Sequence, residues 1–434
     1  MLWRVRPGLE CPVIIAASRQ RSNDFTRQRL LPFAHVVLLI LRGHKLSLQN
    51  ALNKVFQALD QVFSVPKASA YCHARQKLKP EIFIILNRTI CHHFYQNYEA
   101  EGLVKRWRGH RLIGADGTYL NLPDTPETRQ EFTLQANQHE GAECVQALCC
   151  VLYDLRNDLG LGLSLSKRLG ETHRLIDQLW RWTQSGDVLV LDRAYADYSL
   201  FAYAVARQRH LVVRLPRGRF KECEAFWKSK KLEQQLQLSL PTTPSTREFV
   251  KQHNLPATLK VRLIRVLLPT GETEVLLTTL LDAARYPAAD FGQVYNWRWN
   301  EETFFDRFKN IFEVERFSGT SVNTIKQDVH GVLLLTSLES VLGKYDQQEL
   351  ETQAAERETR YVPQINRAVS YVALVDRIIP LLASSRPVEE TLEELHHLFR
   401  QNPTLQRPNR QVPRTPLKYA HRLRFHKYVK KLLA

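Results

Sequence analysis

Tyr-Asn-Trp-Arg-Trp-Asn-Glu-Glu-Thr-Phe-Phe-Asp-Arg-Phe-Lys, residues 295–309, is the stretch from which the organisation of this chain follows. It contains no helix breaker and its apolar residues recur at helical spacing, which predicts a helix. At about 100° per residue, four polar side chains fall within about 60° of one another: Tyr295, Arg298, Glu302 and Lys309. Phe304, Phe308 and Ile311 occupy the opposite side, where a core would hold them.

An ordinary surface helix would explain part of this pattern. Pairs at i, i+4 spacing, such as Arg298 with Glu302, are common and contribute only about 0.3–0.5 kcal/mol each. The complete spacing, Tyr-x2-Arg-x3-Glu-x6-Lys, is more demanding. It resembles the signature of a large family of bacterial insertion-sequence DDE transposases, the one related to the hairpin-forming cut-and-paste enzymes. Trp299 and the run Thr303-Phe304-Phe305 resemble that family too, and the resemblance extends over residues 60–345.

The composition favours a soluble protein with a polyanionic partner. A chain of 434 residues typically forms about three domains, and its formal charge of +17 favours nucleic acid. The longest apolar runs are far shorter than the ~20 residues that span a bilayer, so no membrane segment is expected. Pro12 interrupts a short apolar run near the start, which disfavours a signal peptide. The seven cysteines form no CxxC pair, which indicates reduced thiols and no zinc site.

Residues 1–105 are expected to form a helical DNA-binding domain. Ser47–Leu59 is amphipathic and opens with a capping serine, and Ala68–Leu78 follows a short turn. The second segment carries Arg75 and Lys77, which a helix-turn-helix would place against DNA. A plain helical bundle with a solvated face explains the same pattern. The segment around residues 69–78 also resembles the N-terminal region of the transposases.

Residues 106–345 alternate between strand and helix patterns. Strands are expected at 111–122, 145–152 and 159–166, then a helix at 171–183, a strand at 187–191, a helix at 198–207 and a strand at 211–215. This order is that of a ribonuclease H-like α/β domain. Residues 257–268 and 273–281 predict a β-hairpin. We therefore expect a β-rich insertion at about 217–284 within the catalytic domain, as the family resemblance also implies.

The region 346–434 is expected to be helical with a basic tail. Helices are predicted at 364–382 and 388–400, after a polar segment at 346–358. From Arg407 onward there are nine Lys or Arg residues and no acidic residue, with aromatics interleaved. Such a tail suits contact with phosphates and bases, although a solvated terminus has the same composition.

Three carboxylates are candidates for catalysis and metal binding. Asp116 interrupts an apolar strand, Asp192 ends the run Val188–Leu191, and Glu302 lies in the signature. Phosphoryl transfer between DNA oxygens commonly uses two Mg²⁺ ions about 3.5–4 Å apart, held by hard oxygen ligands. Alternatively, Asp116 could serve a tight turn with Gly117, and Asp192 could cap a helix. Glu301 competes with Glu302, but only Glu302 shares a face with Arg298 and Lys309.

The family resemblance adds roles for the remaining residues. It implies that Arg298 and Lys309 hold phosphates, that Tyr295 contacts a phosphate or terminal base, and that an insertion aromatic, here Trp227, packs against a flipped base. It implies Mg²⁺, with Mn²⁺ as a substitute, and a homodimer that synapses terminal inverted repeats and joins them to target DNA in the bacterial cytoplasm, at the nucleoid. Alternatives are a structure-selective nuclease of the same fold and an inactive repressor derived from a transposase.

Overall fold

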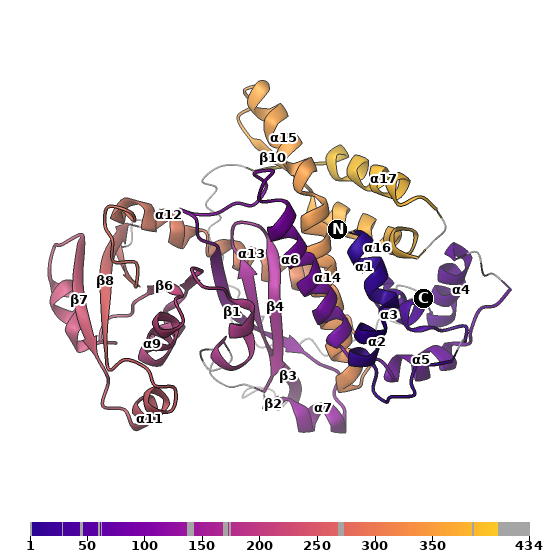
Figure 1. Ribbon diagram of the computed structural model, residues 1–434, viewed down its shortest axis with the longest axis horizontal. Helices are drawn as coiled ribbons and strands as arrows, with labels where there is room; N and C mark the ends of the chain where they lie inside the picture. The colour runs from indigo at the N-terminus through magenta and orange to yellow at the C-terminus, as the bar shows by residue number, and fades with distance from the viewer. Residues whose placement is uncertain are drawn as a thin grey trace.

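The structure is a computed structural model that describes residues 2–27, 29–43, 47–59, 61, 63–136, 143–167, 172, 175–267, 273–383 and 386–406. A large central sheet is flanked on one side by a helical layer built from both ends of the described chain (Figure 1). Within these residues, no helix is both long and apolar enough to cross a membrane.

The central sheet has nine strands in the order β2-β3-β1-β5-β6-β9-β8-β7, with β4 also paired to β3. β1 runs parallel to β5, and β5 runs parallel to β6, whereas the other pairs are antiparallel. The strands are β1 (Leu112–Asn121), β2 (Thr133–Ala136), β3 (Glu143–Asp154), β4 (Leu159–Ser166), β5 (Val188–Leu191), β6 (His210–Arg214), β7 (Glu233–Ser239), β8 (Thr258–Leu267) and β9 (Thr273–Thr278).

The β-rich segment after β6 continues the central sheet. β9 pairs with β6 through Arg214 opposite Leu276, so the segment and the α/β region share one set of backbone hydrogen bonds. β7 and β8 lie at the end of the molecule farthest from α4 and α5 (Figure 1). The expected hairpin corresponds to β8 and β9, and its turn at 269–272 lies outside the described residues. β7 and two helices, α10 (Glu224–Lys228) and α11 (Pro244–Gln252), were not expected.

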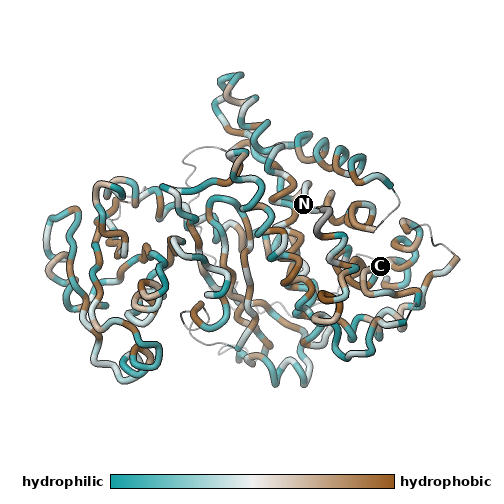
Figure 2. Tube along the Cα trace, viewed as in Figure 1, coloured by the Kyte–Doolittle hydropathy of each residue, from teal (hydrophilic) through white to brown (hydrophobic). Residues whose placement is uncertain are grey.

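α14 (Val322–Leu342) is the central helix of the helical layer. It packs on α6 (Glu81–Asn97) and β4, and also contacts α3 (Phe33–Arg42) and α16 (Arg367–Leu382). Most of its side chains are buried, so the helix forms part of the hydrophobic core. Figure 2 shows the contrast with the outer helices α15 (Lys344–Glu356) and α17 (Val388–Gln401), which are largely hydrophilic.

One hydrophobic cluster joins the terminal regions to the sheet. Its buried residues run from Val5 to Phe399 without separating into independent cores. Helix α16 near the C-terminus packs directly against α1, α3 and α4 near the N-terminus, although they lie far apart in sequence. The boundaries expected near 105 and 345 stay a prediction. The remaining N-terminal helices are α1 (Leu2–Glu10), α2 (Pro12–Ser18), α4 (Leu48–Ala58) and α5 (Ala68–Gln76).

Local signals set several helix ends. α3 begins directly after Pro32, and the Ser47 hydroxyl accepts a hydrogen bond from the backbone N–H of Asn50 at the start of α4. The helix expected at 171–183 differs, because its described part is a π-helical turn, η1 (Leu175–Leu179), followed by a 3₁₀ turn, η2 (Trp180–Trp182). The basic tail from 407 lies outside the described residues.

The remaining elements are short. They are α7 (Pro126–Glu131), η3 (Arg193–Tyr195), α9 (Tyr198–Ala206), η4 (Lys221–Cys223), η5 (Ala288–Asp290), α12 (Phe291–Asn296), α13 (Trp299–Asn310), β10 (Val362–Gln364) and β11 (Thr404–Gln406). The signature therefore forms two helices where one was expected. Trp297 and Arg298 join α12 to α13 and have right-handed helical dihedral angles. The angular spacing of side chains around the helix axis therefore continues from α12 into α13.

Candidate active site

Asp116 and Asp192 lie side by side on adjacent parallel strands. The register pairs Gly114 of β1 with Val190 of β5. Advancing two residues on each strand reaches Asp116 and Asp192, and this step of two keeps both side chains on one face of the sheet. Neighbouring strands lie about 4.8 Å apart, so the two carboxylates belong to one site. The ends of parallel strands are where open α/β sheets commonly bind ligands.

Helix α13 crosses this face of β1 at close range. A Cβ added to Gly114 would lie 2.2 Å from Oε2 of Glu301 and 2.9 Å from Cδ2 of Leu155. Glu301 is fully buried, so its side chain occupies the space that glycine leaves on the strand. Farther along the helix, the Lys309 ammonium donates to the Tyr119 carbonyl oxygen at 2.7 Å. Gly114 therefore permits the approach that brings the next residue, Glu302, toward Asp116.

The polar residues of the signature gather around the aspartates. The Arg298 guanidinium donates to Oε1 of Glu302 at 2.8 Å and lies 5.5 Å from the centre of the Tyr295 ring. The Tyr295 hydroxyl lies 3.5 Å from Oδ1 of Asp192. Glu302 is partly exposed, whereas Arg298 is buried. The structure thus brings together five of the expected site residues, and Lys309 lies on the same helix.

The three carboxylates are close enough to affect one another's charge. Burial raises the pKa of Asp116, and the negative charges of Asp192 and Glu302 raise it further, while the Gly117 N–H and Arg298 oppose the shift. The Gly117 N–H donates to the Asp116 carboxylate at 2.8 Å. The contact with Gly117 that the sequence offered as an alternative role for Asp116 is therefore also present. Burial raises the pKa of Tyr295 to about 12, which keeps the phenol protonated as a hydrogen-bond donor.

The donor set suits a hard divalent cation. Asp116, Asp192 and Glu302 supply only carboxylate oxygens, which Mg²⁺ and Mn²⁺ accept, and a cation would relieve the repulsion that raises the pKa of Asp116. In the described ranges, no three His, Cys, Asp or Glu side chains are gathered tightly enough to hold a metal ion. Glu302 is instead paired with Arg298, so its carboxylate must turn toward the aspartates before it can serve as a ligand.

Three other expected contact residues lie away from this centre. Arg75 is 3% exposed, and its guanidinium donates to Gln327, Ser318, Asp328 and the Thr324 carbonyl. These contacts attach α5 to α14, so an internal role replaces the DNA contact expected of Arg75. Lys77, at the end of α5, is partly exposed, and its DNA contact stays a prediction. Trp227 of α10 packs partly buried against the core, and its expected base contact also stays a prediction.

Two residues near the site were not expected from sequence. The register that pairs Leu191 with Val213 places Arg214 beside Asp192 at the end of β6. Arg214 forms an ion pair with Glu274 of β9 at 2.5 Å, and both charges act on the Tyr295 phenol. An arginine at the end of a strand, next to the strand that a candidate aspartate follows, was the sequence signal that could have revealed Arg214. Glu274 joins the site only because β9 pairs with β6.

The candidate carboxylates, Asp116 within β1, Asp192 directly after β5 and Glu302 on α13, are compatible with the class of DDE transposases. The model of the transposase DDE domain matches residues 107–338, more than half of the chain, and the chain belongs to that family. It is 26% identical over 339 residues to the transposase InsG of insertion sequence element IS4 from Escherichia coli K12. That match covers 75% of this chain and 73% of the relative. The protein is a DNA transposase, an enzyme that cleaves DNA and transfers strands.

A solved structure is also similar at low level. The cryo-EM structure of the piggyBac transposase synaptic complex with hairpin DNA shares 8% identity, with a TM-score of 0.43 over 92% of this chain and 85% of that one. This similarity is too low to carry an argument.

Proposed function

We propose that this transposase acts on the terminal inverted repeats that bound its own insertion sequence, cleaves the DNA there and joins the freed ends to target DNA. One observation carries the proposal: Asp116 of β1 and Asp192, which directly follows the adjacent parallel strand β5, are near enough to Glu302 for all three charges to interact. The related transposase of an insertion sequence supports the mobile-element setting. We place the reaction in the bacterial cytoplasm, at the nucleoid.

We infer that the catalytic core is ribonuclease H-like. The order β4-β3-β1-β5-β6 supports this inference, because three antiparallel strands are followed by two that run parallel to β1. Strands β7 to β9 would then be the insertion that precedes the catalytic helix. In such a core the first aspartate lies on the central strand and the second follows its parallel neighbour, which is the position of Asp116 and Asp192.

The chain's own residues can perform most of the proposed chemistry. Arg298 carries a positive charge beside Glu302, and Lys309 lies farther along the same helix; both would hold the phosphates next to the scissile bond. The protonated Tyr295 hydroxyl would donate to a phosphate oxygen or a terminal base. Asp116, Asp192 and Glu302 would hold two Mg²⁺ ions, or Mn²⁺ in their place. When bound, the ions activate the attacking oxygen and neutralise charge on the leaving oxygen.

DNA binding would extend beyond the active site. The net charge of +17 favours a long contact with phosphates, and Lys77, Trp227 and the basic tail are proposed contact points. Recognition of two ends requires two active sites, so we propose a homodimer in the synaptic complex. Arg75 is not among the proposed DNA contacts, because its guanidinium N–H groups donate to residues inside the protein.

Cleavage of a labelled fragment that carries the element's own end tests this proposal. Wild-type protein, Asp192→Asn and the control Asp124→Asn are incubated with Mg²⁺ or Mn²⁺, and the products are separated on a denaturing gel. Asp124 is an exposed aspartate paired with Arg129, so its variant controls for loss of one charge. We expect discrete cleavage at the end with wild type and control, and none with Asp192→Asn or chelator. Equal binding without cleavage by any of them would instead support a repressor.

A further inference from the structure

The turn between β3 and β4, residues 155–158, holds the signature helices, although it contains none of the three carboxylates. The Asn300 side-chain amide donates to the Leu155 carbonyl oxygen at 2.8 Å. The Arg156 guanidinium stacks on the Trp297 ring at 3.8 Å. The Arg307 guanidinium donates to the Asp158 carboxylate at 2.6 and 3.2 Å. These contacts follow the helix from its first turn to its last.

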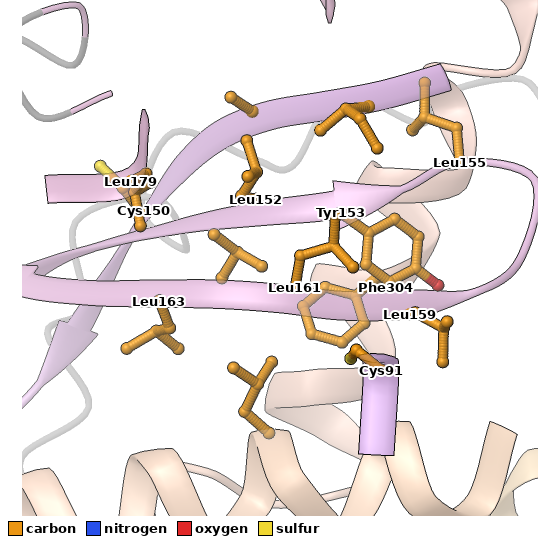
Figure 3. Packing of buried hydrophobic residues seen from close by; sticks show 14 of the residues in the cluster. Cys91, Cys150, Leu152, Tyr153, Leu155, Leu159, Leu161, Leu163, Leu179 and Phe304 are labelled. Carbon is orange, nitrogen blue, oxygen red and sulfur yellow. The ribbon is translucent and has the colours of Figure 1, made fainter. Parts of the chain in front are cut away.

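The helical residues in these contacts form a single stripe. Trp297, Asn300, Phe304 and Arg307 are spaced three, four and three residues apart, which places them within about 80° of one another. The Phe304 ring lies 4.7 Å from the Tyr153 ring at the end of β3, and Figure 3 shows the two rings together. At the same rotation per residue, Glu302 lies on the other side of the helix. The turn therefore contacts one side of α13, and Glu302 lies on the opposite side.

The turn itself is rigidly built. Asp154 accepts hydrogen bonds from the backbone N–H groups of Arg156 and Asn157 at 2.9 and 3.0 Å, and from the Asn157 side chain at 2.9 Å. Asp154 is fully buried, and the Tyr95 hydroxyl of α6 also donates to it. These bonds fix the turn to the neighbouring helix and restrict its movement.

Asp158 connects the signature helix to the C-terminal helices. Besides Arg307 of α13, its carboxylate accepts from the Tyr153 hydroxyl and from Arg367 of α16. Although burial raises the pKa of Asp158, the positive charges of Arg307 and Arg367 outweigh burial and hold the pKa well below its usual range. The carboxylate is therefore charged at neutral pH and links two helices to the sheet.

We propose that the β3–β4 turn positions the catalytic helix, and that Asp158, through Arg307, sets the helix rotation that places Glu302 on the side of the helix toward Asp116 and Asp192. Asp158 is thus a positioning residue. A carboxylate lies about 6 Å from a helix axis, so a rotation of about 10° moves it by about 1 Å. A misplacement of that size can lower a rate about 100-fold. The inference rests on the proposed role of Glu302.

Hydrogen exchange and metal dependence together test the proposal on the full chain. We would compare wild type, Asp158→Asn and the control Asp187→Asn. Asp187 forms a similarly charged, buried pair with Arg111 at the start of β5, where it does not touch α13. Amide exchange is followed by mass spectrometry in peptides from 297–310. Cleavage of the labelled end is measured across Mn²⁺ concentrations, and end binding is measured by gel shift.

We expect Asp158→Asn to speed exchange in 297–310 about tenfold and to raise the half-saturating Mn²⁺ concentration several-fold, with end binding retained. A general loss of stability, as in Asp187→Asn, does not shift that half-saturating concentration. Should Asp158→Asn fail to fold, Arg307→Lys keeps the charge but loses the paired hydrogen bonds, and an intermediate effect is expected.

Unchanged exchange in α13 with an unchanged metal requirement would overturn the positioning role. If wild type does not cleave at all, the proposed function fails, and the exchange of residues 297–310 still decides whether the turn holds the helix.

Discussion

Replacement of Gly114 by alanine tests whether close approach of α13 to β1 builds the active site. The new Cβ would lie 2.2 Å from Glu301 Oε2, where ordinary contacts begin at 3.4 Å, so either the Glu301 carboxylate or the helix that carries it must shift by about 1.2 Å. Glu301 is fully buried and Leu155 closes the other side at 2.9 Å, which leaves the carboxylate little room to move aside. Glu302 follows Glu301 directly and would be displaced with it.

The expected magnitudes follow from that overlap. Overpacking of this kind costs about 1–3 kcal/mol of stability. A displacement near 1 Å at a catalytic group lowers the rate about 100-fold. Gly292→Ala is the matched control, because the same substitution in α12 meets no atom within 4 Å. Gly292 lies in the first turn of α12, so alanine there is expected to stabilise by less than the about 0.5–1 kcal/mol of an interior helical position.

Single-turnover cleavage of the labelled end and thermal melting measure both effects. Gly114→Ala should melt lower and cleave about 100-fold more slowly, whereas Gly292→Ala should cleave like wild type. Gly114→Ala combined with Glu301→Ala removes the clashing carboxylate and should recover part of the rate. Cleavage by Gly114→Ala within about threefold of wild type would refute the reasoning, because the shift would then be harmless.

Four further predictions concern metal, pH and two residues of the N-terminal helices. Millimolar Mg²⁺ or Mn²⁺ should raise the melting temperature of wild type by about 2 °C, but not that of Asp116→Asn, because the cation relieves carboxylate repulsion. Burial lowers the pKa of His330 to about 4, so the unfolded chain gains its proton first as pH falls from about 6.5. Stability should therefore drop by up to about 3 kcal/mol between pH 6.5 and 4, and urea unfolding of His330→Gln should show a smaller drop. Arg75→Ala should destabilise by about 3–5 kcal/mol, because Asp328 loses its ion-pair partner and is left with hydrogen bonds from Ser318, and chemical unfolding measures this loss. Lys77→Ala should leave stability unchanged and reduce the salt slope of DNA binding by about one.

Short-range patterns predicted the elements around the active site well. The expected strands at 111–122 and 187–191 correspond to β1, which contains Asp116, and β5, which Asp192 directly follows. Alternating apolar residues specify such strands without help from distant contacts. β7 also alternates, since Leu236 and Leu238 face inward between polar residues, but its run of glutamines weakened the pattern.

Residue identity proved a weaker guide to residue role in the N-terminal helices. Arg75 and Lys77 are neighbouring cations at the end of one helix, and sequence gives both the same expected DNA contact. The structure separates them, because the partners of Arg75 lie on α14, about 250 residues farther along the chain. The local sequence of α5 does not predict the contacts of Arg75 with α14.

The sequence by itself determined the family signature, the three candidate carboxylates and most strands and helices, because these depend on residue type and short-range spacing. Only the tertiary structure decided which side chains share a site. It joined β9 to β6, brought Glu274 near Tyr295, buried Arg75 and set the β3–β4 turn against α13. Such contacts join residues far apart in the chain. They depend on the packing of whole elements, which no local pattern encodes.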